Sequence, residues 1–183
     1  SLDLIHEAAN ELGFPCRFID IGAGDSRLAD ALIEDPRFEL TALDISAPAL
    51  DRLADRLGQR ADRLRRIVAD ASSWTPDATW DLWHDRAAFH FLLQPAEIEA
   101  YVRAAAQAIR PGGRLIVATF APDGPEKCSG LPIARYDAPS LADVFAPAFR
   151  LLSSHPHHHP TPFGTTQSFV FVVLERSEAA NGL

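Results

Sequence analysis

The chain has 183 residues, 47% of them hydrophobic and 23% charged, and its formal net charge is −8. This length fits one domain over residues 1–183 with a substantial core. The acidic balance argues against a nucleic-acid partner, which requires a basic face. The two cysteines, Cys16 and Cys128, lie far apart, as is typical of free thiols in the cytoplasm. No apolar run has transmembrane length, so no membrane partner is expected.

Apolar runs alternate with helical patterns along the chain, which is typical of β-α-β units and a parallel sheet. The opening residues, SLDLIHEAAN, already have the pattern of an amphipathic helix. Buried strands are predicted at residues 16–21, 38–45, 65–70, 80–85 and 114–121. Helices are predicted at 27–35, 46–60 and 95–109, the second capped by Ser46 with Pro48 in its first turn.

The alternation of predicted strands and helices is interrupted at two places. The run RPGG at 110–113 is expected to end the helix before it in a turn. After residue 121, a short helix is predicted at 139–149, and segments 149–157 and 167–176 are expected to pair as antiparallel strands. The arginine-rich stretch 56–66 is expected to be helical, with Leu57 and Leu64 inside and the cations solvated. The predicted fold class is α/β.

The segment DIGAGDS, residues 20–26, follows the first predicted strand and holds two glycines, Gly22 and Gly24. A dinucleotide-binding loop would carry a third glycine where this chain has Arg27. Asp20 and Asp25 would also repel a pyrophosphate, so an NAD-type oxidoreductase is disfavoured. Acidic residues around a glycine turn suit a ligand that is cationic there, and S-adenosylmethionine, with its ammonium and sulfonium groups, meets that description.

Two further carboxylates close predicted strands. Asp44 follows Gly24 by 20 residues, and a carboxylate there can accept hydrogen bonds from both hydroxyls of a ribose. Asp70, in the run ADAS, can accept a bond from an adenine amino group, while the amide of Ala71 can meet a ring nitrogen. Dehydrogenases also bind a ribose through an acidic residue at the position of Asp44, so Asp44 indicates a ribose rather than one particular cofactor.

With these motifs in order, the chain resembles a class I S-adenosylmethionine-dependent methyltransferase over essentially its whole length. The pieces that carry the resemblance are DIGAGDS, LDIS, ADAS, WDLWHDRAAFHFL and IRPGGRLIVATF. The resemblance implies a Rossmann-like sheet of seven strands, mostly parallel with an antiparallel last strand, and helices on both faces. It also implies a lid before the first helix, which this sequence is expected to lack. The implied cofactor-binding residues are Asp20, Gly22, Ala23, Gly24, Ser26, Asp44, Ile45, Asp70, Ala71, Ser72, His84 and Arg86.

The segment after the fourth strand runs beside the sulfonium in this family, which makes His84, Asp85 and Arg86 candidates for the reaction centre. A base is needed only if the acceptor must lose a proton, and His84 and His90 have a suitable ordinary pKa. The candidate catalytic residues are therefore His84, Asp85 and His90. The alternative is structural: Arg86 pairs with Asp85, and His90 packs under the following helix.

The loop at 121–137 is expected to roof the acceptor site, because loops beyond the strand ends carry specificity in open α/β sheets. Lys127 and Cys128 could suggest a nucleophile, but methyl transfer needs no covalent enzyme intermediate, so they are expected to cap the pocket or simply to turn the chain. Arg135 with Tyr136 either binds a carboxylate on the acceptor or makes surface contacts. The prolines around His155, His157, His158 and His159 favour a polar hairpin loop over a metal site, with Gly164 reversing the chain. No metal is predicted.

The predicted function is methyl transfer to a small-molecule acceptor whose accepting atom is open. A protein-lysine methyltransferase of the same fold is the first alternative, and it should show an acidic groove for the cationic side chain. Relatives of that type carry DKGT where this chain has HDRA. A non-catalytic module that binds S-adenosylmethionine is the second alternative, and its acceptor cavity should be blocked by side chains.

Overall fold

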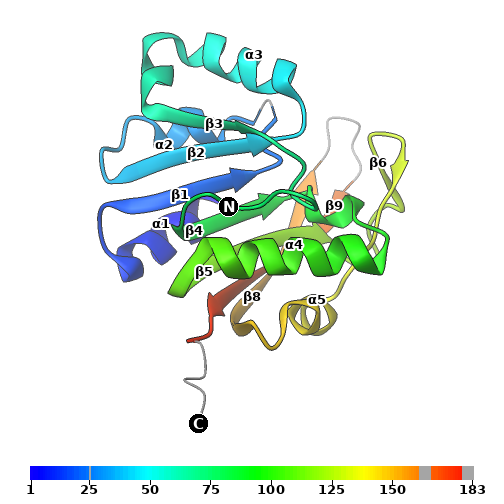
Figure 1. Ribbon diagram of the computed structural model, residues 1–183. Coiled ribbons are helices and arrows are strands. Elements are labelled where there is room, and N and C mark those ends of the chain that lie inside the picture. The colour runs from blue at the N-terminus through cyan, green and yellow to red at the C-terminus, as the bar shows by residue number, and fades with distance from the viewer. Residues whose placement is uncertain (25, 161–165, 179–183) are drawn as a thin grey trace.

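The computed structural model describes residues 1–24, 26–160 and 166–178. Its main sheet has seven strands in the order β3-β2-β1-β4-β5-β9-β8 (Figure 1). They are β1 (Cys16–Ile21), β2 (Phe38–Asp44), β3 (Leu64–Val68), β4 (Trp80–Arg86), β5 (Ile109–Phe120), β8 (Phe149–Pro160) and β9 (Thr166–Arg176). The first five strands pair in parallel, and β9 pairs antiparallel to both β5 and β8. The predicted fold class, including the antiparallel last strand, is confirmed.

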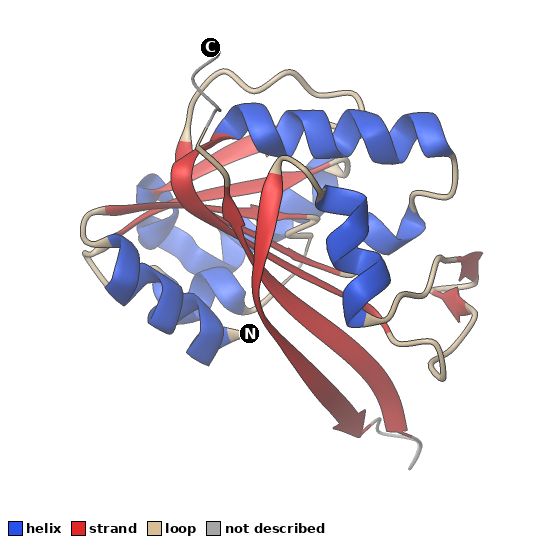
Figure 2. Cartoon of the chain, turned by 90° about the horizontal axis from the view of Figure 1, so that it is seen from below, coloured by secondary structure: helices blue, strands red, loops and turns tan. Residues whose placement is uncertain are grey.

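Helices cover both faces of the sheet (Figure 2). One core lies under α1 (Leu2–Leu12), α2 (Leu28–Leu32) and α3 (Ala47–Leu57). The other lies under α4 (Pro95–Ala108) and α5 (Ala138–Phe145). Alternate strand residues feed the two cores, as Leu82 and Trp83 of β4 do. The sheet is therefore buried on both sides, and its carboxyl edge is the place where loops can build a site.

Local signals placed several boundaries correctly. Ser46 caps α3 by accepting the Ala49 amide, with Pro48 in the first turn as predicted. The helix is shorter than 46–60 because Gly58 adopts a φ of +59° and ends it. A 3₁₀ helix, η1 (Gly58–Arg63), follows and leads into β3. The prediction of one helix over 56–66 is therefore wrong, since Leu64 begins a strand.

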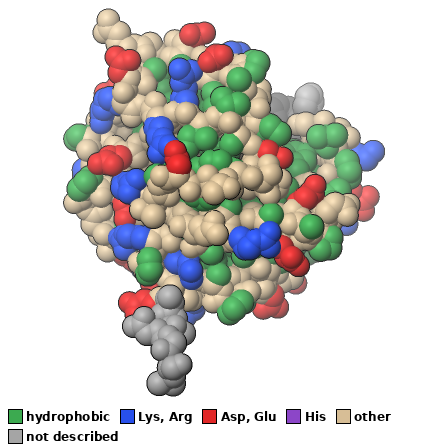
Figure 3. All heavy atoms as spheres, viewed as in Figure 1, with side chains coloured by type: hydrophobic (Ala, Val, Ile, Leu, Met, Phe, Trp, Pro, Cys, Tyr) green, Lys and Arg blue, Asp and Glu red, His purple; other side chains and the backbone are tan. Residues whose placement is uncertain are grey.

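Three arginines of that stretch remain on the surface as expected, but they are paired rather than free. Arg60, Arg65 and Arg66 contact carboxylates at 3.1, 2.6 and 2.9 Å. Over the face seen in Figure 3, Lys and Arg side chains lie among Asp and Glu side chains. Such a mixed surface is not the basic stripe that nucleic acid requires.

Two other predicted boundaries are wrong. The RPGG run does not form a turn, because β5 begins at Ile109 and continues through it. The RPGG residues are accommodated by a shift in the pairing of β5 with β4, which lies between Trp80 and Leu82 of β4. The expected histidine loop is largely strand, since His155, His157 and His158 lie in β8, and β8 and β9 form a long antiparallel pair (Figure 2). Gly164 lies outside the described residues.

Candidate active site

The glycine turn leaves β1 in a backbone conformation that side chains disfavour. Gly22 has a φ of +64° and Gly24 a φ of +47°. A Cβ added at Gly22 would lie 2.5 Å from the Cβ of Ala88, in the segment that follows β4. The turn therefore passes against that segment at a distance only glycine allows. This close approach brings the ends of β1 and β4 together at one place.

Asp44 stands at the end of β2 and ties two turns together. One carboxylate oxygen accepts the Gly24 amide at 2.7 Å, and the other accepts the Ser46 amide at 2.8 Å. Each oxygen retains further acceptor capacity for a ligand. Asp70 lies two residues beyond β3, where it accepts the Ser72 amide at 2.8 Å. It thus follows its strand rather than closing it.

Two cavities open at the carboxyl edge of the sheet. The first, of about 910 Å³, is lined by residues from the ends of β1, β4, β5 and β9 and from the start of α1. The second, of about 570 Å³, is lined by residues that follow β1, β2, β3 and β4, together with Tyr101 of α4. Both are lined by Gly22 and Ala87. They therefore meet where the glycine turn touches the segment after β4.

The structure divides the predicted cofactor residues between these cavities. Asp20, Gly22, Ser26, His84 and Arg86 line the first. Gly22, Asp44, Ile45, Asp70, Ala71 and Ser72 line the second. Ala23 and Gly24 shape the turn between them and line neither cavity. Asp44 and Asp70, which are predicted to bind the nucleoside, thus lie on the other side of Gly22 from Asp20 and His84.

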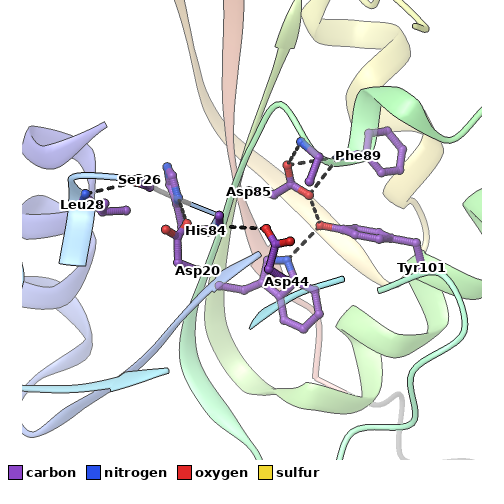
Figure 4. A network of polar contacts seen from close by, with 11 residues as sticks. Asp20, Ser26, Leu28, Asp44, His84, Asp85, Phe89 and Tyr101 are labelled. Carbon is purple, nitrogen blue, oxygen red and sulfur yellow. Dashed lines mark hydrogen bonds and ion pairs between the residues drawn. The ribbon is translucent and has the colours of Figure 1, made fainter. Parts of the chain in front are cut away.

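His84 and Asp20 form a buried pair across neighbouring strands (Figure 4). They are register partners on β4 and β1, and His84 Nδ1 lies 2.7 Å from Asp20 Oδ1. Among the described residues, His84 Nε2 has no hydrogen-bond partner. If Nδ1–H donates to Asp20, Nε2 carries the lone pair of the neutral ring. Of the three predicted catalytic residues, His84 is the one that lines a described cavity.

Asp85 points to the other face of the sheet and is completely buried. Its carboxylate accepts the amides of Ala88 and Phe89 and the hydroxyl of Tyr101, the last at 2.6 Å (Figure 4). Trp83 in turn donates to the Tyr101 oxygen. Burial raises the pKa of Asp85 to about 6, although these hydrogen bonds act in the opposite direction. The carboxylate organises the segment after β4 rather than facing either cavity.

The expected pair between Arg86 and Asp85 is wrong, because the two side chains leave β4 on opposite sides. Asp85 is held by Tyr101, whereas the Arg86 guanidinium lies 5.3 Å from the centre of the Phe169 ring. Tyr101 was missed as a site residue since it sits in an alanine-rich helical pattern that indicates core. A lone hydroxyl on the buried face of that helix was the signal available.

His90 lies outside both cavities and is buried, as the structural alternative expected. Its ring stacks on Phe120, with centroids 5.4 Å apart and planes 11° apart. It does not stack under the following helix, because Phe120, its stacking partner, belongs to the core under α1, α2 and α3. Neither ring nitrogen has a partner among the described residues. Burial lowers the pKa of His90 to about 4, so the ring is neutral near pH 7.

This environment leads to a prediction about acid stability. Unfolded His90 takes up a proton near pH 6.5 while the folded ring does so near pH 4, so folding loses stability as the pH falls through this window. We expect the His90→Phe variant, which keeps the stacking, to lose about 2 kcal/mol less than the parent between pH 7.5 and pH 5. Urea unfolding at the two pH values measures this, and equal losses in both proteins would contradict it.

A two-stranded hairpin, β6 (Lys127–Cys128) and β7 (Leu131–Pro132), lies between the cavities. Its first strand and Ser129 line the first cavity, and its second strand lines the second. The loop at 121–137, expected to roof the acceptor site, therefore contributes to the lining of both cavities. Arg135 makes the alternative surface contact, an ion pair with Glu126 at 3.3 Å. Tyr136 packs against Phe89 instead of lining a cavity.

Two histidines of β8 contact serine side chains. The side chain of His155 contacts Ser153, and that of His158 contacts Ser168. Within residues 1–24, 26–160 and 166–178, no group of three or more metal-binding side chains gathers. Over the same residues, no helix has the length and apolar character needed to cross a bilayer.

Comparisons with known proteins bear on the family and the fold. Residues 19–115, more than half of the chain, match the family model of a methyltransferase domain. A search of curated proteins finds no match. These residues contain the glycine turn, Asp44, Asp70 and the segment after β4, which are the features that carry the resemblance described above.

Several solved structures share the fold. A methyltransferase of Methanosarcina mazei superposes with a TM-score of 0.78 at 16% identity, covering 96% of this chain and 98% of that one. The N-methyltransferase NodS of Bradyrhizobium japonicum gives 0.76 at 12% identity, covering 97% and 94%. The 1,6-didemethyltoxoflavin-N1-methyltransferase of Burkholderia thailandensis gives 0.73 at 23% identity, covering 94% and 76%. The chain therefore belongs to the methyltransferase domain family, and the expected S-adenosylmethionine-dependent methyltransferase is confirmed.

Proposed function

We propose that the chain transfers a methyl group from S-adenosylmethionine to a small-molecule acceptor in the first cavity. The observation that carries this proposal is the meeting of the two cavities at Gly22 and Ala87. A cofactor with its nucleoside in the second cavity then presents its sulfonium at the junction. An acceptor in the first cavity lies on the other side of that junction, as in-line displacement at carbon requires.

The residues present fit the cofactor. Asp44 and Asp70 supply the acceptors that ribose hydroxyls and an adenine amino group need, and Leu43 and Leu92 add apolar surface to the same cavity. Asp20 suits the ammonium of the methionine portion. A Cβ at Gly22 would lie 2.5 Å from the Cβ of Ala88, so glycine is the residue that lets the turn pass against the segment after β4. When bound, S-adenosylmethionine supplies an activated methyl group.

The chain's own part in the reaction is mainly to position the reactants. The glycine turn and Asp44 hold the cofactor side, and the hairpin β6–β7 covers both cavities. His84 is our proposed base for an acceptor that must lose a proton to Nε2, with Asp20 orienting the ring and stabilising its charged form. We leave Asp85 and His90 with structural roles, because neither lines a described cavity.

The first cavity supports a small acceptor over the two alternatives. A lysine side chain would be repelled by Arg27, Arg86 and Lys127, which all line the cavity. A non-catalytic module should have lost the acceptor space, whereas about 910 Å³ is open here. The Burkholderia thailandensis methyltransferase binds a small molecule, 1,6-didemethyltoxoflavin, together with S-adenosylhomocysteine.

Calorimetric titration with S-adenosylhomocysteine, and separately with NAD, tests this proposal. We expect micromolar binding of the homocysteine product and none of NAD. Asp44→Ala should weaken the binding of S-adenosylhomocysteine by roughly 100-fold, since two charge-assisted hydrogen bonds to the ribose hydroxyls are lost. Asp143→Asn, an exposed change on α5, serves as the control. Binding of NAD alone, or an Asp44→Ala variant that binds like the parent, would contradict the proposal.

A further inference from the structure

The first cavity gathers cations that the rest of the chain does not neutralise. Most arginines contact a carboxylate, as Arg114 contacts Glu175 at 2.6 Å. Within the part of the chain that the structure describes, the exceptions that make no hydrogen bond or ion pair through the side chain are Arg27, Arg63, Arg86 and Lys127. All of these except Arg63 line the first cavity. In a protein of net charge −8, this concentration of unpaired cations indicates an anionic ligand.

Arg86 lies over an apolar floor. Its guanidinium is 5.3 Å from the centre of the Phe169 ring, a cation–π distance that leaves the N–H groups available. Phe169 and Phe120 are register partners on β9 and β5, with ring centroids 4.3 Å apart. Both rings line the cavity. The rings of Phe120 and Phe169 are only 3% and 5% exposed, so an acceptor that reaches Arg86 meets a small area of aromatic carbon.

The carboxylates around the cavity are fewer than its cations. Asp3 and Asp20 line it together with Arg27, Arg86 and Lys127, and Asp20 also contacts His84 at 2.7 Å. The cofactor brings one ammonium, which suits Asp20, and one carboxylate, which requires one cation. Arg27 directly follows Ser26 of the glycine loop and is the cation best placed in the chain for that carboxylate. Arg86 and Lys127 remain without a partner.

We infer that the acceptor is a small anionic molecule whose anionic group pairs with Arg86 and Lys127. This inference rests on the proposed function, and it names the substrate class of the same site. It moves Arg86 from the cofactor side, where the resemblance put it, to the acceptor side. Arginine is suited to this role because its planar fork can bind a carboxylate or phosphate through two N–H groups.

Matched probes that differ in charge test the inference. Calorimetry at saturating S-adenosylhomocysteine and pH 7.5 compares 4-hydroxybenzoate with 4-hydroxybenzamide and indole-3-acetate with indole-3-acetamide. Phenyl phosphate distinguishes a phosphate from a carboxylate as the preferred anion. We expect an anion to bind about tenfold tighter than its neutral counterpart, since charge-assisted hydrogen bonds are stronger than neutral ones.

Two arginine variants make the comparison specific. Arg86→Gln should reduce the preference for the anion, since Lys127 alone then remains, and leave the affinity for S-adenosylhomocysteine within about twofold of the parent. Arg63→Gln removes an equally unpaired cation from η1, outside the first cavity, and should preserve the preference. No anion preference across the probes, or loss of S-adenosylhomocysteine affinity in Arg86→Gln, would overturn the inference. Failure of the unaltered chain to bind S-adenosylhomocysteine would overturn the proposed function itself.

Discussion

Replacing Gly22 with alanine is expected to destabilise the fold by about 2–4 kcal/mol. It is also expected to weaken the binding of S-adenosylhomocysteine on the order of tenfold or more. Two costs combine at this position. The backbone φ of +64° disfavours any side chain, and the new methyl group would lie 2.5 Å from the Cβ of Ala88. Since real Cβ atoms do not approach so closely, the turn or the segment after β4 must shift. Either shift changes the junction of the two cavities.

Gly58 offers a matched control for the conformational cost alone. Its φ is +59°, yet a Cβ there would meet nothing within 4 Å. Because its ψ is −134°, outside the left-handed helical region, Gly58→Ala should cost about 1–3 kcal/mol and leave ligand affinity unchanged. Urea unfolding and calorimetry on both variants separate the effects. Equal losses of stability, with S-adenosylhomocysteine bound normally by Gly22→Ala, would show that the close approach does not matter for the site.

Residues whose role depends on local sequence were predictable. Ser46 and Pro48 mark the start of α3, and the structure places both as the pattern indicates. Asp44 was identified because it ends an apolar run at a fixed distance from the glycine turn, and both signals lie within one β-α-β unit. The order of the parallel strands follows from the same alternation, because such units pair in a restricted way.

Contacts that depend on register could not be predicted. The pair of His84 and Asp20 exists because β4 lies beside β1 with those residues opposite each other, although 64 positions separate them. The hairpin β6–β7 has only two residues in each strand, too few to give a periodic pattern. Tertiary packing decided both.

The RPGG run shows a local signal overridden by its neighbours. Pro and Gly predict a turn, but a Cβ at Gly113 would lie 2.8 Å from the Asp81 carbonyl oxygen of β4. It would also lie 2.9 Å from the Arg110 carbonyl oxygen, so glycine permits the crowded bulge by which β5 shifts its register against β4. A glycine that permits close packing and one that permits a turn are indistinguishable in a single sequence.

Asp85→Asn should make the free energy of unfolding less sensitive to a rise in pH from 4.5 to 8. The pKa of Asp85 is raised to about 6 in the folded chain, whereas an unfolded carboxyl titrates near 3.9. Its stabilising contribution is therefore complete below pH 3.9 and is lost as the pH rises through 6. Between pH 4.5 and pH 8 the free energy of unfolding of the parent should fall by about 2 kcal/mol relative to the variant.

The difference between the two proteins isolates Asp85, because His90 and the surface groups titrate in both. Asparagine keeps Oδ1 for the Ala88 and Phe89 amides, so the segment after β4 retains its anchor. Its new N–H can donate to the Tyr101 oxygen, which reverses the bond that Tyr101 donates to Asp85. Asp143→Asn, an exposed carboxyl on α5, should show no such trend. A parent–variant gap that is flat with pH would mean that the buried carboxylate ionises without penalty. The network around Tyr101 would then compensate its burial fully, and Asp85 would be charged at every pH at which the enzyme works.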